Sequence, residues 1–311
     1  MKNNNTTTFQ LSILLFFINY GIINILGYKT FLNISSKNII ISLLLGFILG
    51  YILLNIYLYI FNKINIKNYI NNKIFKIIAL TILSILFVYF IYKLTIFIQY
   101  IYLNKSSLIF IIITLLFLFL YTSSINSVIL SRSLEILFYI LLLLFLFKTI
   151  SLTSLVDTNY LLPIISNNYF NILKSSLLFG FIFSSSLLLI YTFYNKEINN
   201  KKIKHYLTTS FLVAFIMIII NFILIISIMG INLATIYEYP EVMMLKNIKY
   251  FNFIERIDYL LSFEYLISIY ALLSIILLNI KKIMNSFKSK LVSKNFYLFI
   301  ILLFIISIII C

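Results

Sequence analysis

The sequence predicts an all-α polytopic membrane protein, and its composition and the length of its apolar runs carry that prediction. With 63% hydrophobic and 10% charged residues and a mean hydropathy of +1.10, the chain would not stay in solution as a globular domain. A membrane-spanning helix needs about 20 apolar residues, and the chain divides into about nine such segments with short links. Barrel strands would instead alternate in segments of about ten residues. We expect one integral membrane domain over 1–311, with a short cytoplasmic tail over 1–10.

The predicted spans follow one another with little chain between them. They are Leu11–Leu32, Ile39–Phe61, Ile74–Leu103, Leu108–Ile129, Leu134–Ile150, Asn171–Tyr194, Tyr206–Gly230, Ile257–Ile280 and Phe296–Cys311. The first span is interrupted by Asn19, Gly21 and Asn24 and is followed by no small-residue cleavage pattern. We therefore expect it to be retained rather than removed as a signal peptide.

The distribution of charge predicts the orientation. The net charge of +16 indicates little alone, because abundant Ile, Asn, Lys, Tyr and Phe are typical of AT-rich genomes. Lysines gather in alternate loops, at Lys63, Lys67, Lys73 and Lys76, at Lys196, Lys201, Lys202 and Lys204, and at Lys281, Lys282, Lys288, Lys290 and Lys294. Acids occupy loops between them, at Asp157 and at Glu238, Glu241, Glu255 and Asp258. The positive-inside rule then places the amino terminus in the cytoplasm and Cys311 outside.

The chemistry that the chain can support is limited. Lysines on membrane loops are suited to anionic lipid, and no basic soluble fold with interleaved aromatics indicates nucleic-acid binding. One cysteine allows neither an intrachain disulfide nor a thiolate metal site, and the single His205 is expected to be solvated. Without paired histidines, a GxSxG sequence or a phosphate-binding glycine loop, we expect no enzyme, cofactor or metal. The alternative is a membrane glycosyltransferase or polymer ligase using Asp157 or Glu238, although such enzymes usually have a large outer loop.

Two of the six glycines interrupt apolar segments. Gly21 lies between Asn19 and Asn24, and Gly180 shortly precedes a run of three serines. Corresponding breaks in two halves of a transporter-like chain would free backbone groups near the midplane, where half-helix amino ends attract a carboxylate. The alternative is that each glycine only permits close helix packing. Packing better explains Gly46 and Gly50, which have GxxxG spacing.

Ionisable residues inside the bilayer are costly. Lys93 and Glu264 are therefore functional candidates, although each could instead reach an interface by snorkelling. Arg132 and Glu135 stand three residues apart and are expected to pair at the cytoplasmic interface as a structural feature.

Several stretches, in order, resemble the B subunit of spore-germination nutrient receptors, in the amino-acid/polyamine/organocation transporter superfamily. Phe17–Gly21 is similar to the family's first helix and Ser131–Leu137 to the start of its fifth, and Leu161–Ile164 followed by Ile172–Lys174 is similar to the outer loop before the sixth. The most specific match is Tyr239-Pro240 followed by Phe253–Asp258, which resembles the family's YP…F-x-ER-x-E outer loop.

The resemblance covers roughly Phe9 to Ile280. It implies ten helices in a five-plus-five inverted repeat, with broken first and sixth helices lining a small-molecule pocket. It also implies a role in germinant recognition in the inner spore membrane, together with A and C subunits. After the eighth span only one apolar run remains, so we expect that the family's last helix is missing or that the chain is truncated. The chain also departs in lacking a GxG-like run after Gly21, in carrying Ser184-Ser185 where relatives often have Gly-Glu, and in having Tyr265 where relatives have tryptophan.

Both lines lead to one hypothesis, in which a nutrient, most simply an amino acid, binds between the first and sixth helices. The ligand-binding residues expected are Tyr20, Gly21, Asn24, Gly180, Ser184 and Ser185. Glu255 and Arg256 are expected to shape the pocket lid or a subunit contact rather than to perform chemistry, and Tyr239 and Pro240 belong to the same outer loop, with a structural or coupling role. Binding would favour one helix arrangement and pass that bias to the partner subunits. The alternatives are an amino-acid or polyamine permease and, less favoured because of the YP…ER order, a polysaccharide polymerase or flippase.

Overall fold

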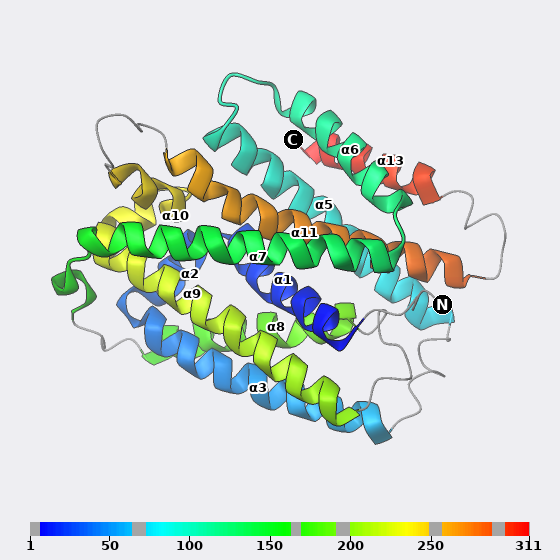
Figure 1. Ribbon diagram of the computed structural model, residues 1–311, viewed down its shortest axis with the longest axis horizontal. Helices are drawn as coiled ribbons and strands as arrows, with labels where there is room; N and C mark the ends of the chain where they lie inside the picture. The colour runs from blue at the N-terminus through cyan, green and yellow to red at the C-terminus, as the bar shows by residue number, and fades with distance from the viewer. Residues whose placement is uncertain are drawn as a thin grey trace.

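The computed structural model describes residues 7–63, 73–162, 169–190, 200–248, 257–287 and 296–310, and these contain helices and no strand (Figure 1). The α-helices are α1 (Thr8–Leu26), α2 (Tyr28–Ser35), α3 (Ile39–Lys63), α5 (Lys73–Ile101), α6 (Leu108–Ser124), α7 (Ser127–Leu152), α8 (Tyr169–Ile190), α9 (Asn200–Ile236), α10 (Pro240–Met243), α11 (Ile257–Ser286) and α13 (Phe296–Ile310). Short 3₁₀ turns are η1 (Ser36–Asn38), η2 (Thr153–Leu155), η3 (Thr158–Leu161) and η5 (Met244–Asn247). This confirms the predicted all-α class.

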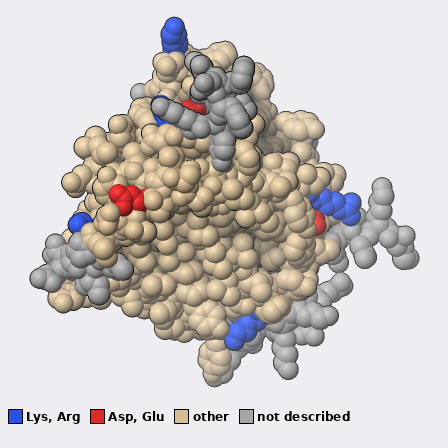
Figure 2. Space-filling model, turned by 60° about the vertical axis from the view of Figure 1, so that its left-hand side comes forward, with Lys and Arg blue, Asp and Glu red and all other residues tan. Residues whose placement is uncertain are grey.

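The described helices are suited to lipid. Six helical segments are long and apolar enough to cross a membrane. Three further helices, α6, α8 and α13, are apolar over a shorter length. Large apolar side chains such as Ile85, Phe117 and Leu143 are exposed. The face in Figure 2 is correspondingly uncharged over most of its width, with Lys, Arg, Asp and Glu near its margins. The chain is an integral membrane protein whose outer surface is solvated by hydrocarbon.

Helix α1 lies at the centre of the bundle. Figure 1 shows α3, α8 and α9 on one side of it and α5, α6, α11 and α13 on the other, with α7 crossing in front. Helix α1 packs against α9, α11, α8 and α7, and nearly all of its residues are buried, including Asn19 and Asn24. Because hydrocarbon does not reach this helix, its polar residues can face other protein groups.

The helix contacts have the pairing that an inverted repeat predicts. We count α1 with α2 as the first helix, and α3, α5, α6, α7, α8, α9, α11 and α13 as the second to ninth. An inverted repeat relates helices one to four to helices six to nine, so the contact between α1 and α9 should have a counterpart between α8 and α3. Both contacts are extensive. The pairs α5·α11 and α6·α13, which this relation maps onto themselves, are also in contact. One asymmetry stands out: α1 packs closely on α11, whereas α8 has no comparable contact with α5. The α1·α11 interface is the one that carries the polar cluster described below.

The helix break in the first predicted span lies at Gly27 rather than at Gly21. Gly27 has φ 82° and ψ 139° and separates α1 from α2, a conformation that is essentially restricted to glycine. The hydroxyl of Thr30 donates to the carbonyl of Gly27 (2.8 Å) and so satisfies a group that the break releases. A second glycine of positive φ, Gly230 (φ 68°), kinks α9 against the ring of Tyr160.

The predicted breaks at Gly21 and Gly180 are wrong, because both residues lie inside continuous helices. A Cβ atom on Gly21 would lie 2.8 Å from the carbonyl oxygen of Ser268. A Cβ atom on Gly180 would lie 3.1 Å from the Cβ of Leu49, and Gly46 and Gly50 face the same contact. The missing side chains let α1 approach α11 and let α8 approach α3, which is the packing alternative.

One predicted boundary also fails. The fourth span was expected to reach Ile129 and the fifth to begin at Leu134, but α6 ends at Ser124 and α7 begins at Ser127. The link consists of Ile125 and Asn126, both with extended backbone. The turn lies in the polar stretch Thr122–Ser127, in which only Ile125 is apolar, so the prediction overlooked a break in hydropathy that the sequence contains.

Replacing Gly27 by alanine tests the break. Nothing lies within 4 Å of the added Cβ, so any loss of stability comes from the backbone conformation, and we expect about 1–3 kcal/mol. Thermal unfolding of the detergent-solubilised protein measures it. An unchanged midpoint would mean that this position readily adopts an ordinary conformation.

Candidate functional site

The centre of the bundle holds an ion pair shielded from solvent. The ammonium of Lys148, on α7, lies 2.6 Å from a carboxylate oxygen of Glu264, on α11, and both side chains are 0% exposed. Lys148 also lies over the rings of Phe145 and Tyr265, at 4.9 and 5.0 Å from their centroids. Aromatic faces attract a cation when water is excluded, so the pair is held by its neighbours as well as by its own attraction.

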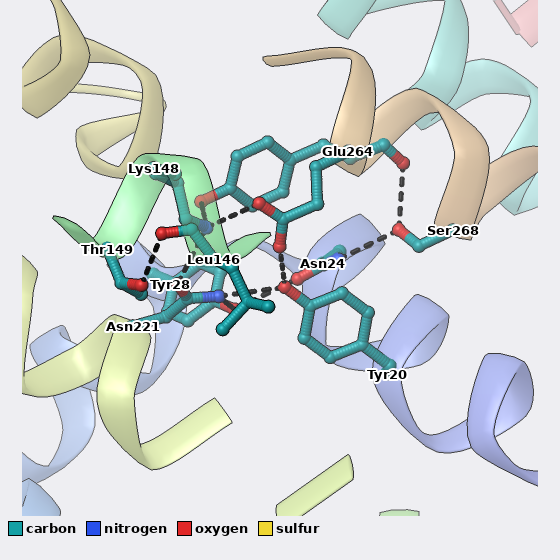
Figure 3. A network of polar contacts seen from close by, with 10 residues as sticks. Tyr20, Asn24, Tyr28, Leu146, Lys148, Thr149, Asn221, Glu264 and Ser268 are labelled. Carbon is teal, nitrogen blue, oxygen red and sulfur yellow. Dashed lines mark hydrogen bonds and ion pairs between the residues drawn. The ribbon is translucent and has the colours of Figure 1, made fainter. Parts of the chain in front are cut away.

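Asn221, on α9, connects this pair to the first spanning helix (Figure 3). Its side-chain oxygen accepts a hydrogen bond from Lys148 (2.8 Å), and its amide nitrogen donates to the hydroxyls of Tyr20 (2.9 Å) and Tyr28 (2.8 Å). The hydroxyl of Tyr20 donates to Glu264. Four separate segments of the fold therefore converge on one polar cluster.

The cluster continues along α1 towards α11. Tyr28, the residue directly after the break at Gly27, donates to the side-chain oxygen of Asn24 (2.9 Å). The amide of Asn24 donates to the hydroxyl of Ser268 (2.8 Å), and Ser268 donates to the carbonyl of Tyr265. Because Tyr28 belongs to α2 and Asn24 to α1, this chain of bonds spans the break and fixes the two helices relative to each other.

The energetics of the cluster argue for a function. Removing two charges from water costs several kcal/mol per ion, and an ion pair seldom stabilises a fold more than apolar residues of the same volume would. In a membrane such groups mark ligand, ion or proton sites by default. The cluster is also internally paired, so its present arrangement is a closed one in which protein groups neutralise one another.

The residues predicted to form an outer loop lie near one end of the cluster. Pro240 is the first residue of α10, and the ring of Tyr239 packs edge-on against Phe97 at 5.1 Å. The next residue, Glu241, is 0% exposed, and neither of its carboxylate oxygens has a hydrogen-bond partner among the described residues. Burial raises the pKa of Glu241 to about 8, although its own backbone N–H and the field of Lys148 act in the opposite direction. Burial also raises the pKa of Tyr239.

The structure brings together three of the predicted site residues, Tyr20, Asn24 and Glu264. Gly21 lies beside them as a packing residue. Gly180 and Ser184 lie elsewhere: Gly180 packs against α3, and Ser184 donates to a carbonyl of its own helix. The side chain of Ser185, together with Glu255 and Arg256, lies outside the described residues.

Two predicted charges have other surroundings. Lys93 is half-buried and lies over the ring of Tyr89 at 6.0 Å, away from the cluster. Among the ion pairs of the described residues there is none between Arg132 and Glu135. Glu135 instead accepts a hydrogen bond from Gln10 (3.1 Å), which itself forms a capping box with Thr7 at the start of α1.

Sequence reasoning missed Lys148, Asn221 and Tyr28. Lys148 ends the run LLLLFLFK and Asn221 follows IMIII, so a single polar residue in an apolar stretch was the available signal. In the part of the chain that the structure describes, no three His, Cys, Asp or Glu side chains gather as metal ligands. The cluster offers instead one cation, one anion and several hydroxyl and amide groups.

Comparison with known proteins gives one result. A search of curated proteins finds no match. The family model described as spore germination protein, Spore_permease, matches residues 5–311, nearly the whole chain. The chain therefore belongs to the spore germination protein (spore permease) family of membrane proteins.

Proposed function

We propose that this protein is the nutrient-sensing membrane subunit of a spore germination receptor, with an amino acid as the ligand class. The observation that carries the proposal is the buried pair of Lys148 and Glu264 at the meeting of α1, α7, α9 and α11. A free amino acid carries one carboxylate and one ammonium. It could replace the internal pair by presenting its carboxylate to Lys148 and its ammonium to Glu264, without leaving either charge unpaired.

The break at Gly27 supplies the conformational change that sensing requires. Tyr28 and Asn24 bridge the break and are hydrogen-bonded to the same cluster as the ion pair. A ligand that separates Lys148 from Glu264 would alter these bonds and so favour another position of α2 relative to α1. Such a population shift needs only differential affinity, and we propose that A and C subunits in the inner spore membrane receive it, with the amino terminus on the cytoplasmic side. No chemical step is needed.

An amino-acid or polyamine permease is the second candidate, because a closed site at the centre of an inverted repeat would also serve alternating access. Deleting the gene in its spore-forming host separates the two. Lost germination towards one nutrient with unchanged uptake of the radiolabelled nutrient would support the receptor. Lost uptake with normal germination would support the permease, and no change in either would contradict both.

Replacing Tyr20 by phenylalanine tests the cluster itself in the complemented strain. The change removes one hydroxyl that bonds both Glu264 and Asn221, and hydrogen bonds to charged groups are worth about 1.5–3 kcal/mol. The nutrient concentration for half-maximal germination should rise about tenfold or more. Tyr139→Phe, on the exposed side of α7, is the matched control and should respond normally. Equal responses from the two variants would remove the cluster from the proposed site.

A further inference from the structure

Glu241 is the buried acidic group that the cluster leaves without a partner. It lies on α10, which packs against α2 and α9 and continues into η5, itself packed against α11. Every other residue of α10 and η5 that is buried is apolar or proline. An acid fully enclosed by such surroundings, with both oxygens unpaired among the described residues, destabilises the closed fold unless another interaction offsets the cost of burying it.

The neighbours of Glu241 place it at the outer end of the cluster. It lies close enough to Lys148, Tyr28 and Tyr265 to interact with them electrostatically. The neighbouring acid, Glu238, is half-exposed and already neutralised by Lys29 at 2.9 Å. The two acids of this turn therefore differ: one is solvated and paired, and the other faces the protein interior without a counter-ion.

We infer that Glu241 is a ligand-binding residue that receives the cationic amine of the ligand at the outer end of the buried cluster. This inference rests on the proposed function and refines it, because it makes a protonated amine a required feature of the ligand. An ammonium has three N–H donors, so the bound amine can be shared by Glu241 and Glu264 while the ligand's carboxylate meets Lys148. Ionised Glu241 gains a counter-ion, and the orphaned oxygens gain hydrogen-bond donors.

The protonation of Glu241 gives the site a pH dependence. Burial raises its pKa to about 8, so the closed protein holds it neutral at pH 7, whereas a bound ammonium favours the ionised form. Binding then releases a proton, and the affinity for amines should increase about tenfold per pH unit up to pH 8. The charged and titratable groups that act on it are Lys148, Tyr28 and Tyr265 across the cluster and Glu238 and Tyr239 on its own turn.

The test uses thermal stabilisation of the purified full-length protein by three small probes of similar size: L-alanine, isopropylamine and propionate. The two amines should raise the unfolding midpoint and propionate should not. Glu241→Gln should raise the half-saturating amine concentration at least tenfold and abolish its pH dependence. Glu238→Gln, the same change three residues away, should still bind the amines and should keep the pH dependence of that binding.

Three outcomes would overturn the inference: stabilisation by propionate equal to that by the amines, unchanged amine binding in Glu241→Gln, or no stabilisation by either amine at about 100 mM, where even weak binding shifts the midpoint. If Glu241→Gln does not fold, Glu241→Leu serves as the second variant. It removes the unpaired acid and should be at least as stable as the unmodified protein. Germination that proceeds normally without the gene, alongside amine binding through Glu241, would contradict the receptor role and leave this site standing.

Discussion

Replacing Lys148 by methionine is expected to lower the free energy of unfolding by about 3–5 kcal/mol, since it leaves Glu264 buried without its counter-ion. Both side chains are fully buried and 2.6 Å apart, so water cannot substitute for the lost ammonium. The remaining carboxylate would have no counter-ion, and Asn221 would lose the donor to its side-chain oxygen. The unfolding midpoint in detergent, followed with a fused fluorescent protein, measures the loss.

The double variant Lys148→Met/Glu264→Gln separates stability from function. It removes both charges together, so most of the lost stability should return. Germination towards the nutrient should not return, because neither end of an amino acid then has an ionic partner. Lys93→Met is the control: this half-buried lysine lies over Tyr89 and should change stability by no more than about 1 kcal/mol.

Comparing the single and double variants can contradict the proposed ligand site in two ways. A double variant as unstable as Lys148→Met would mean that the two charges do not stabilise each other. A double variant that germinates normally would mean that the pair is not where the ligand binds. The two readouts are independent, because stability depends on the closed cluster and germination depends on what replaces it.

The sequence predicted the helices more completely than the site, for a physical reason. Apolar runs of spanning length force helices because hydrocarbon offers no partner for backbone groups, so α3 and α11 begin where expected, at Ile39 and Ile257. A helix break has no such signature. Gly21 and Gly27 lie six residues apart in the same segment, yet Gly21 stays helical in close contact with α11, whereas the break falls at Gly27.

The polar cluster could be predicted only in part. Glu264 was predicted because an ionisable residue in an apolar span is costly, and Tyr20 and Asn24 were predicted because they flank Gly21. Lys148 obeys the same rule, but it lies close to the end of its predicted span, where a lysine can reach the interface. Which polar residue faces a partner and which faces an interface depends on the rotation of each helix. One sequence read alone leaves that rotation open when helices are apolar all round.

Replacing Gly46 by alanine should lower the free energy of unfolding by about 1–3 kcal/mol, the usual effect of overpacking a tight contact. The added Cβ would lie 2.5 Å from the Cβ of Phe179 and 3.0 Å from the carbonyl oxygen of Ser176, on α8. Neither atom is the flexible end of a side chain, so α3 and α8 must move apart. This shift would also disturb Gly50 and Gly180, which make the same contact.

The sign of this effect is what makes the experiment decisive. In an open helix, alanine is favoured over glycine by about 1 kcal/mol, so a stabilised Gly46→Ala variant would show that α3 and α8 are not in close contact. Gly46→Leu should yield no folded protein, because a larger side chain cannot be placed between two backbones. Ile48→Ala, exposed on the same helix, should stay within about 0.5 kcal/mol of the unmodified protein. Three graded results on one helix would therefore locate the α3·α8 interface independently of the ligand.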